Sequence, residues 1–362
     1  MARFCLLFVF LLLFSWTQAS EFDIVYTEEV PATCYGLDAR LNKWEAEAKE
    51  LYSTGMQAVL NVGTNLVAQK SFTAFLGVEF HYVNSVAVPV DQNLFNKVQT
   101  TISLANNFLS GRGYPQMRVK PRVYCGDEFL QQRQWTDIAL DSTGEKVKRP
   151  ESEQASTGQP FYSIGEVYSQ VPWLAGRVPF WLPAEKGYMF TEAPEGGSFC
   201  EGTESAFGIT YIGVPGQHYL RGTQQQSVTP FMDFISLCTD AFVDSSHVDT
   251  LGHYGYIDPT SGVGLEFILP ESATLVHEIA HLVTGNLGYD PKELNLDPLR
   301  LMIRDHGSSA LRDMLALDPA LKADNAESYV YFLVAWWQYY KYKDSGKPAA
   351  AFYPGFAVSW DY

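Results

Sequence analysis

Apolar residues recur at helical spacing in three long stretches of the chain. The first runs from Leu37 to Val62 and the second from Pro89 to Gly111, each with polar or charged residues between the apolar positions. The third begins near Pro270 and Ser272 and ends near Gly285, residues suited to a helix start and stop. Its apolar residues favour a buried helix, and they are Leu275, Val276, Ile279, Leu282 and Val283.

Three shorter runs between the second and the third of these stretches have strand character. They are 118–125, 207–214 and 231–238, and Pro121 favours an edge position for the first of them. Near the C-terminus, Asp318-Pro319 predicts a helix start, and Asp324 or Asn325 predicts the start of another helix that runs to Lys343. The pattern predicts an α+β fold with a small sheet, in which helices carry the functional site.

The beginning of the chain has the features of an export signal. Arg3 precedes a short apolar run, and Thr17-Gln18-Ala19 supplies small residues for cleavage. We therefore expect residues 1–19 to be a signal peptide and residues 20–362 to form a single secreted domain. The stretch near 140–160 is rich in Ser, Gly, Glu and Lys and is expected to be a polar loop, and 161–194 is expected to be irregular.

Charge and cysteine content narrow the choice of partners. The formal net charge of −16 argues against binding to nucleic acid or to an anionic membrane surface. After the signal no apolar stretch reaches the length of a membrane span, so we expect an exported protein without a membrane span. We also expect a monomer. Four cysteines remain in the mature chain, which predicts two disulfides with three possible pairings: Cys34, Cys125, Cys200 and Cys238.

The third helical stretch contains the pattern H-E-x-x-H. His277 and His281 are four residues apart, so on a helix they project from one face and can reach one zinc ion. Glu278 follows the first histidine and can take a proton from the water that zinc activates. The alternative is a core helix with two hydrogen-bonded histidines, but that helix would bury three polar side chains without a reason.

A catalytic zinc usually takes a third protein ligand. The H-x-x-G-x-x-H continuation of one zinc-protease class does not follow His281. From the residues alone the third ligand stays open among six acidic or imidazole side chains: Asp290, Asp297, Asp305, Glu327, His253 and His306.

Six pieces of the chain resemble the fungal deuterolysin-type metallopeptidases, the aspzincins. These pieces are Cys34, Thr73–Val78, Tyr124-Cys125, Ile235–Cys238, the H-E-x-x-H and Asn325–Phe332. The resemblance implies a zincin-like domain with the H-E-x-x-H helix and a second ligand-bearing helix. Together with sequence order it also implies the pairing Cys34–Cys125 and Cys200–Cys238.

The chain departs from the aspzincin pattern in two places. The family's G-T-x-D-x-x-Y-G segment is missing, with Gly288-Tyr289-Asp290 as its nearest counterpart. The family's N-A-D segment reads Asn325-Ala326-Glu327. The third ligand is therefore either Glu327 from the second helix or Asp290 from the loop, and Glu327 is favoured because it lies near a predicted helix start.

These features predict a secreted zinc metalloendopeptidase that acts on protein or peptide substrates. His277, His281 and Glu327 are the expected zinc ligands, and Glu278 is the expected general base. The competing interpretation is a catalytically silent secreted zinc-binding protein or antigen. An intact Glu278 favours the enzyme, because zinc binding alone does not need it. A structural domain without metal is the third interpretation.

Overall fold

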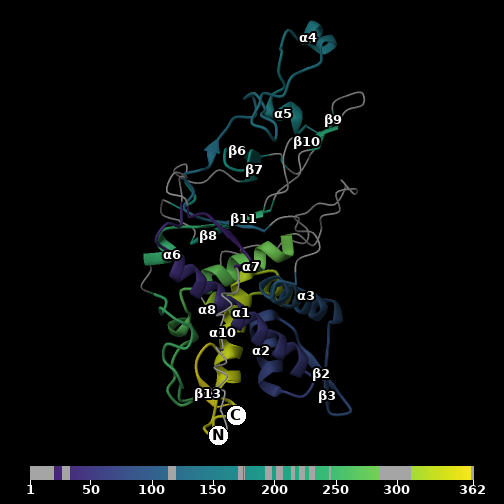
Figure 1. Cartoon of the computed structure of the whole chain (residues 1–362). Coiled ribbons are helices and arrows are strands. Elements are labelled where there is room, and N and C mark those ends of the chain that lie inside the picture. Colours follow the sequence, from purple (N-terminus) through teal and green to yellow (C-terminus); the bar gives the residue numbers. More distant parts are fainter. Residues whose placement is uncertain are drawn as a thin grey trace, which may run out of the picture.

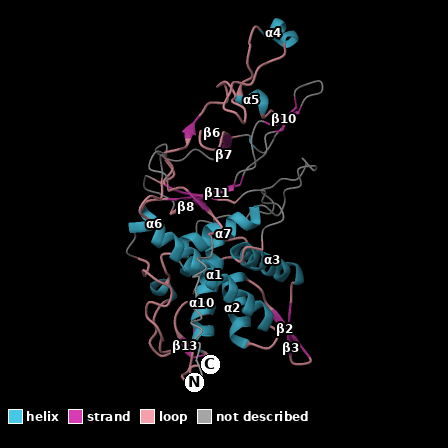
Figure 2. Cartoon of the chain, viewed as in Figure 1, coloured by secondary structure: helices cyan, strands magenta, loops and turns pink. Residues whose placement is uncertain are grey.

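The structure is a computed structural model of the whole chain. It describes residues 20–26, 33–112, 120–169, 174, 176–191, 198–200, 207–212, 217–219, 225–227, 233–243, 246–285 and 311–359. The long helices gather in one half of the molecule, and most strands and loops lie in the other half (Figure 2). The described fold is mixed α+β, as the sequence pattern predicts. The expected signal, residues 1–19, lies outside the described residues.

Five of the described helices make up most of the helical half. These five are α1 (Asp38–Asn61), α2 (Leu66–Leu76), α3 (Gln92–Leu109), α7 (Ala273–Gly285) and α10 (Ala326–Tyr342). The longest two, α1 and α3, pack against each other. Helix α10 is apolar on all sides, and 13 of its 17 residues are buried, so it forms the centre of the helical core. Gly55 of α1 lets α10 approach closely, because a Cβ there would lie 2.4 Å from Leu333 Cδ2.

The ends of these helices follow their local sequence. The Asp91 side chain accepts hydrogen bonds from the amides of Asn93 and Leu94 at the start of α3, and Asn65 caps α2 in the same way. The predictions of α1, α3, α7 and α10 are confirmed, while α2 is an addition to them. The shorter helices are α4 (Glu151–Thr157), α5 (Ile164–Val167), α6 (Asp240–Val243), η3 (Leu265–Ile268), α8 (Leu311–Leu315) and α9 (Pro319–Ala323).

A four-stranded sheet lies over α7, with the strand order β1-β4-β11-β8. The strands are β1 (Asp23–Ile24), β4 (Arg122–Cys125), β8 (Gly208–Ile212) and β11 (Asp233–Leu237). Strands β1, β4 and β11 are parallel, and β8 runs antiparallel to β11, pairing Gly208 with Leu237 and Ile212 with Asp233. Among the described strands β8 therefore forms one edge of this sheet.

The expectation of an edge position for the strand after Pro121 is wrong. Strand β4 lies between β1 and β11. Pro121 precedes the first paired residue, Arg122, so its missing amide removes no hydrogen bond from the ladder. The Pro121 carbonyl instead accepts a bond from the amide of Asp23, 3.0 Å away.

The remaining strands form four small sheets. The three-stranded sheet is β5-β6-β7 (Gln131–Gln132, Val178–Leu182, Gly187–Thr191). The two-stranded sheets are β2-β3 (Phe80–Val83, Val86–Pro89), β9-β10 (Gln217–Tyr219, Gln225–Ser227) and β12-β13 (Ala350–Ala351, Val358–Ser359). The hairpin β6-β7 lies in the stretch that was expected to be irregular. Its alternation is hidden because nearly every residue of β6 is buried.

The segment near 140–160, expected to be a polar loop, contains helix α4 and isolated β-bridges. Leu140 pairs with Lys146, and Lys148 pairs with Phe161. Val147 is 2% exposed and packs with Tyr162 in a small core of its own. This arm extends from the strand-rich half in Figure 1 and ends at α4. Its polar composition reflects exposure of most side chains around a few buried anchors.

Two disulfides join the sheet to its surroundings. Cys34, just before α1, is bonded to Cys125 at the end of β4, and Cys200 is bonded to Cys238 at the end of β11. This is the pairing that the aspzincin resemblance and the sequence order implied. None of the helices in the described part of the chain combines the length and apolar character that crossing a bilayer requires.

Candidate metal centre

Helix α7 supports the H-E-x-x-H side chains from the middle of the molecule. It lies between the sheet above, where it contacts β8 and β11, and helices α1, α3 and α10 below (Figure 1). Val276, Ile279 and Ala280 are fully buried, so the helix cannot rotate without exposing them to water. The Tyr52 hydroxyl of α1 donates to the Val276 carbonyl at 2.9 Å, which fixes the helix beside the first histidine.

The two histidines of the motif face each other. His277 Nε2 and His281 Nε2 are 3.1 Å apart, and the ring centroids are 4.9 Å apart. A tetrahedral zinc with bonds of about 2.0–2.1 Å holds two ligand atoms about 3.3 Å apart. The pair of nitrogens therefore fits two positions of a zinc site, and no rearrangement of the helix is needed.

Glu327 approaches the same histidine from α10. Its Oε2 atom lies 3.0 Å from Nδ1 of His277, and the two side chains are 20% and 19% exposed. Asn325 is the N-cap of α10, so Glu327 stands in the first helical turn, as the sequence predicted. The contact is on the ring nitrogen that faces away from His281. A carboxylate in this position fixes the tautomer and orientation of a metal-binding imidazole.

The described side chains supply two zinc ligands directly. Among them no group of three His, Cys, Asp or Glu side chains is arranged as a complete metal cage. Glu327 would have to leave Nδ1 of His277 to become the third ligand, so its ligand role stays a prediction. His253 contacts Asp249 at 2.8 Å on a separate loop. Four other candidates lie outside the described residues: Asp290, Asp297, Asp305 and His306.

Glu278 points toward the edge strand β8. The residue is 3% exposed. The Thr210 hydroxyl lies 2.6 Å from Glu278 Oε2 and 2.9 Å from the Glu278 carbonyl oxygen. Gly208 of the same strand also approaches the carboxylate, and an added Cβ there would come within 2.7 Å of Glu278 Oε1. The expected general base is thus enclosed by one helix and one strand.

Among the described tyrosines, Tyr331 of α10 lies close enough to Glu327 to feel its charge. It lies one turn after Glu327 on α10 and is 3% exposed. Burial raises its pKa well above the ordinary value, and the charges of Glu327 and Glu266 raise it further, so its hydroxyl remains protonated. Tyr329 is different, because its hydroxyl donates to the Ala323 carbonyl at 2.9 Å inside the core. Tyr289 lies outside the described residues.

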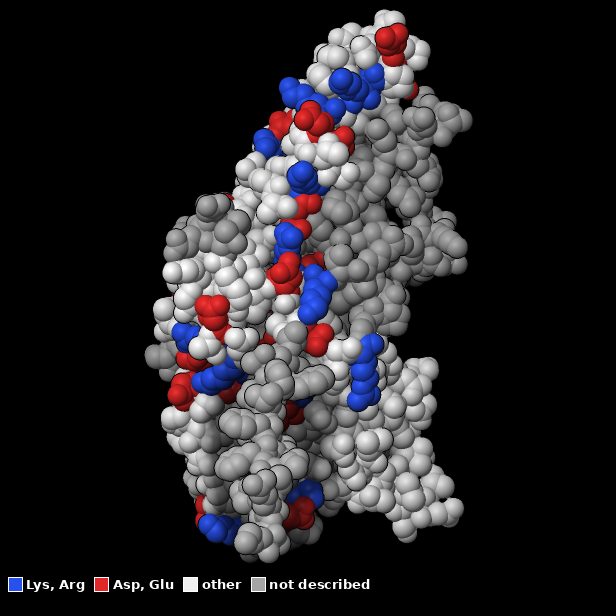
Figure 3. All heavy atoms as spheres, viewed as in Figure 1, with Lys and Arg blue, Asp and Glu red and all other residues white. Residues whose placement is uncertain are grey.

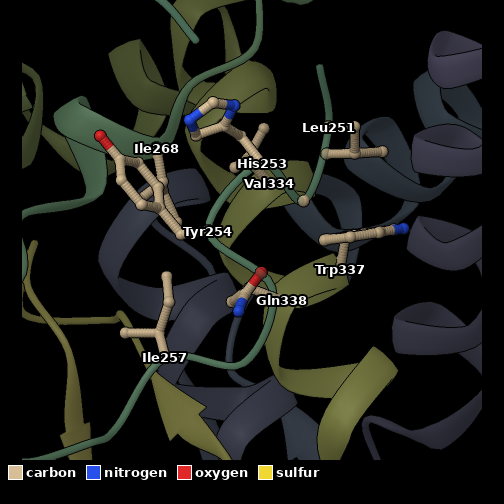
Figure 4. A pocket seen from close by; sticks show the side chains of 9 residues that line it. Leu251, His253, Tyr254, Ile257, Ile268, Val334, Trp337 and Gln338 are labelled. Carbon is tan, nitrogen blue, oxygen red and sulfur yellow. The ribbon is translucent and has the colours of Figure 1, made fainter. Parts of the chain in front are cut away.

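A small cavity of about 10 Å³ lies near the middle of α10, away from the histidine pair. In Figure 4, Trp337 and Gln338 of α10 line this cavity together with Leu251 and Ile257, which lie between α6 and η3 in the chain. Trp337 is ten residues beyond Glu327, which is about 15 Å along a helix. The cavity is much smaller than typical ligand sites, and none of the H-E-x-x-H side chains lines it.

The surface charge is mixed on the face shown in Figure 3. Described Lys and Arg side chains there are interspersed with Asp and Glu. Arg122 pairs with Glu185 at 2.6 Å, and Arg40 pairs with Glu271 at 2.6 Å. On this face the described residues form no extended field of one sign that would attract a polyanion.

Thr210 and Gly208 are site residues that the sequence did not indicate. The stretch around them was predicted only as a strand, and neither belongs to a motif. Comparisons with protein-family models, curated proteins and solved structures found no match to this chain. The aspzincin resemblance therefore rests on the motif residues alone.

Proposed function

We propose that this protein is a secreted, zinc-dependent endopeptidase of zincin-like architecture, similar to the deuterolysins. One observation carries the proposal: two imidazole nitrogens face each other at 3.1 Å on a buried helix, with the Glu278 side chain between them in sequence. Hydrogen bonds to Glu327 and Thr210 satisfy His277 and Glu278, and a bound zinc would account for the facing imidazole nitrogens.

His277 and His281 hold the metal in this proposal, each through Nε2. When bound, zinc polarises the scissile carbonyl and lowers the pKa of the attacking water. Glu327 is the acidic member of the centre and, in the described conformation, holds His277 through Nδ1. The carboxylate keeps Nε2 free of a proton and directed toward His281, because it fixes the proton on Nδ1.

Glu278 moves the proton in the proposed reaction. Its carboxylate accepts a proton from the attacking water and later delivers it to the leaving amine. Burial at 3% exposure removes bulk water that would compete for the carboxylate. Tyr331, which stays protonated, is a hydrogen-bond donor near the same centre.

The edge strand β8 supports a peptide as substrate. It passes beside Glu278, and in the described part of the chain no strand pairs with its outer edge. An extended peptide can add to such an edge through backbone hydrogen bonds. Because these hydrogen bonds use only the backbone, a peptide of any sequence could be held beside Glu278 in this way.

The proposed location is outside the cell. Two disulfides are typical of proteins from oxidising compartments, which agrees with the signal expected at residues 1–19. The direct test is digestion of casein by the purified mature protein, with metal analysis of the same sample. We expect about one zinc per chain and cleavage that 1,10-phenanthroline stops and added zinc restores. Zinc without cleavage would instead indicate the silent binding protein.

A further inference from the structure

We infer that Thr210 is a positioning residue for Glu278, and that Gly208 provides the space in which the Glu278 carboxylate is held. The inference rests on the proposed function, because it concerns the base of that reaction. Both residues belong to β8, and both contact the same carboxylate from the strand side.

The hydrogen bonding identifies the acceptor of the Thr210 proton. A hydroxyl has one proton to donate, and two Glu278 oxygens lie within reach, the carboxylate at 2.6 Å and the carbonyl at 2.9 Å. The carbonyl, inside α7, already accepts the helical bond from four residues later. The carboxylate oxygen is the stronger acceptor, and 2.6 Å is typical of a hydroxyl bonded to an ionised carboxylate.

Gly208 sets how closely the carboxylate approaches the strand. An added Cβ would come within 2.7 Å of Oε1, 2.9 Å of Cγ and 3.0 Å of Cδ of Glu278. Alanine therefore cannot be accommodated without moving the Glu278 side chain. Gly208 pairs with Leu237 in the register of the sheet, so the backbone itself is held in place.

The two contacts leave Glu278 one arrangement instead of several. A glutamate side chain has three rotatable bonds, and holding it against the strand removes that freedom before substrate arrives. Oε2 is occupied by Thr210, and Oε1 lies on the side of Gly208. The strand that is proposed to receive the peptide therefore also positions the base, which ties the two parts of the site together.

The test compares four variants with the wild type, all loaded with zinc. Thr210→Val removes the hydroxyl and keeps the shape, Thr210→Ser keeps the hydroxyl, and Gly208→Ala displaces the carboxylate. Thr73→Val is the matched control, since the Thr73 hydroxyl of α2 lies 3.0 Å from the Gln69 carbonyl and 2.8 Å from the Val78 carbonyl just after the helix. Casein turnover, KM, zinc content and melting temperature are measured for each.

We expect Thr210→Val and Gly208→Ala to lower kcat about 10- to 100-fold with little change in KM and with zinc retained. Thr210→Ser restores most of the rate, and Thr73→Val has the wild-type kcat. A purely structural role predicts a lower melting temperature with an unchanged kcat for the folded protein. A wild-type kcat in Thr210→Val with full zinc would overturn the inference.

Binding of acetohydroxamate gives a readout that does not depend on turnover. A hydroxamic acid would lose its hydroxyl proton on chelating a zinc held by His277 and His281, and in the proposed site Glu278 would be the carboxylate that accepts it. We expect its affinity to fall about tenfold in Thr210→Val and Gly208→Ala, and to recover in Thr210→Ser. If the wild type binds zinc but cleaves no casein, the endopeptidase proposal fails. The difference in acetohydroxamate affinity between wild type and Thr210→Val still tests whether Thr210 positions Glu278. Equal affinities in wild type and Thr210→Val would overturn it.

Discussion

His277 and Glu327 are 50 residues apart in the chain and are joined by a 3.0 Å contact between Nδ1 and Oε2. The contact links α7 to α10, the two helices that the H-E-x-x-H pattern and the N-A-E segment occupy. It gives the first histidine a fixed orientation and leaves its other nitrogen directed toward His281. In the proposed centre, metal binding by α7 therefore depends on α10 as well.

Removing either histidine should remove the metal. We expect about one zinc per wild-type chain and no retained zinc in His277→Ala or His281→Ala, because each variant leaves one of the facing nitrogens without its partner. Metal analysis after dialysis measures this. His253→Ala is the matched control and should keep its zinc, since His253 contacts Asp249 away from α7. Full occupancy in His281→Ala would contradict the assignment of the centre.

Changing Glu327 to glutamine should weaken zinc binding without abolishing it. The glutamine carbonyl can still accept the Nδ1 proton of His277, but the charge is lost. Loss of such an outer partner typically costs about 10- to 100-fold in metal affinity. Competition with a zinc chelator measures the change. A complete loss of zinc, equal to that of His281→Ala, would show that Glu327 binds the metal directly.

The helices and the core of the motif could be predicted from sequence because their signals are local. Apolar spacing identifies α1 and α7, and the four-residue spacing of His277 and His281 places both on one face. The neighbours of the motif are set by pairing across the sheet. Gly208 and Thr210 meet Glu278 only because β8 pairs with β11 above α7, and no local pattern encodes that pairing.

The errors of the sequence interpretation also have physical causes. Pro121 favoured an edge strand, but it stands just outside the ladder, so β4 can lie inside the sheet. The hairpin β6-β7 was missed because buried residues on both faces of β6, such as the neighbours Phe180 and Trp181, erase the alternation. The polar arm around Val147 was expected to be a loop, since its few buried anchors are far apart in sequence.

The two disulfides should stabilise the fold strongly. Peptide mapping without reduction should recover Cys34 linked to Cys125 and Cys200 linked to Cys238. Replacing Cys34 and Cys125 together by alanine should lower the free energy of unfolding by about 4 kcal/mol, because the bond closes a loop across 91 residues. Denaturant titration measures the loss. Other linked pairs, or four free thiols, would contradict the described pairing.

The arm that carries α4 should lose stability in acid. The hydrogen bond from Arg149 lowers the pKa of Glu166 from 4.5 to about 2. Because the folded pKa lies below the unfolded value, this contribution is complete above pH 4.5 and is lost as the pH falls toward about 2.

Glu166→Gln should therefore reduce protection of the arm from hydrogen exchange at pH 6 more than at pH 3. Glu151→Gln, at an exposed position on α4, serves as the control. The effect should be modest, because the Glu166 side chain is 47% exposed. If Glu166→Gln lost more protection from hydrogen exchange at pH 3 than at pH 6, the result would contradict a lowered pKa for Glu166.

The most direct test of the account is the Glu278→Gln variant, assayed for zinc and for casein cleavage beside the wild type. We predict about one zinc per chain in both proteins. The rate of casein cleavage should be about 10²- to 10⁴-fold lower in the variant, because glutamine keeps the shape of the side chain but accepts no proton. Glu271→Gln, an acid that pairs with Arg40, should cleave at the wild-type rate. Cleavage by Glu278→Gln at the wild-type rate, or no cleavage by a wild type that holds its zinc, would contradict the account.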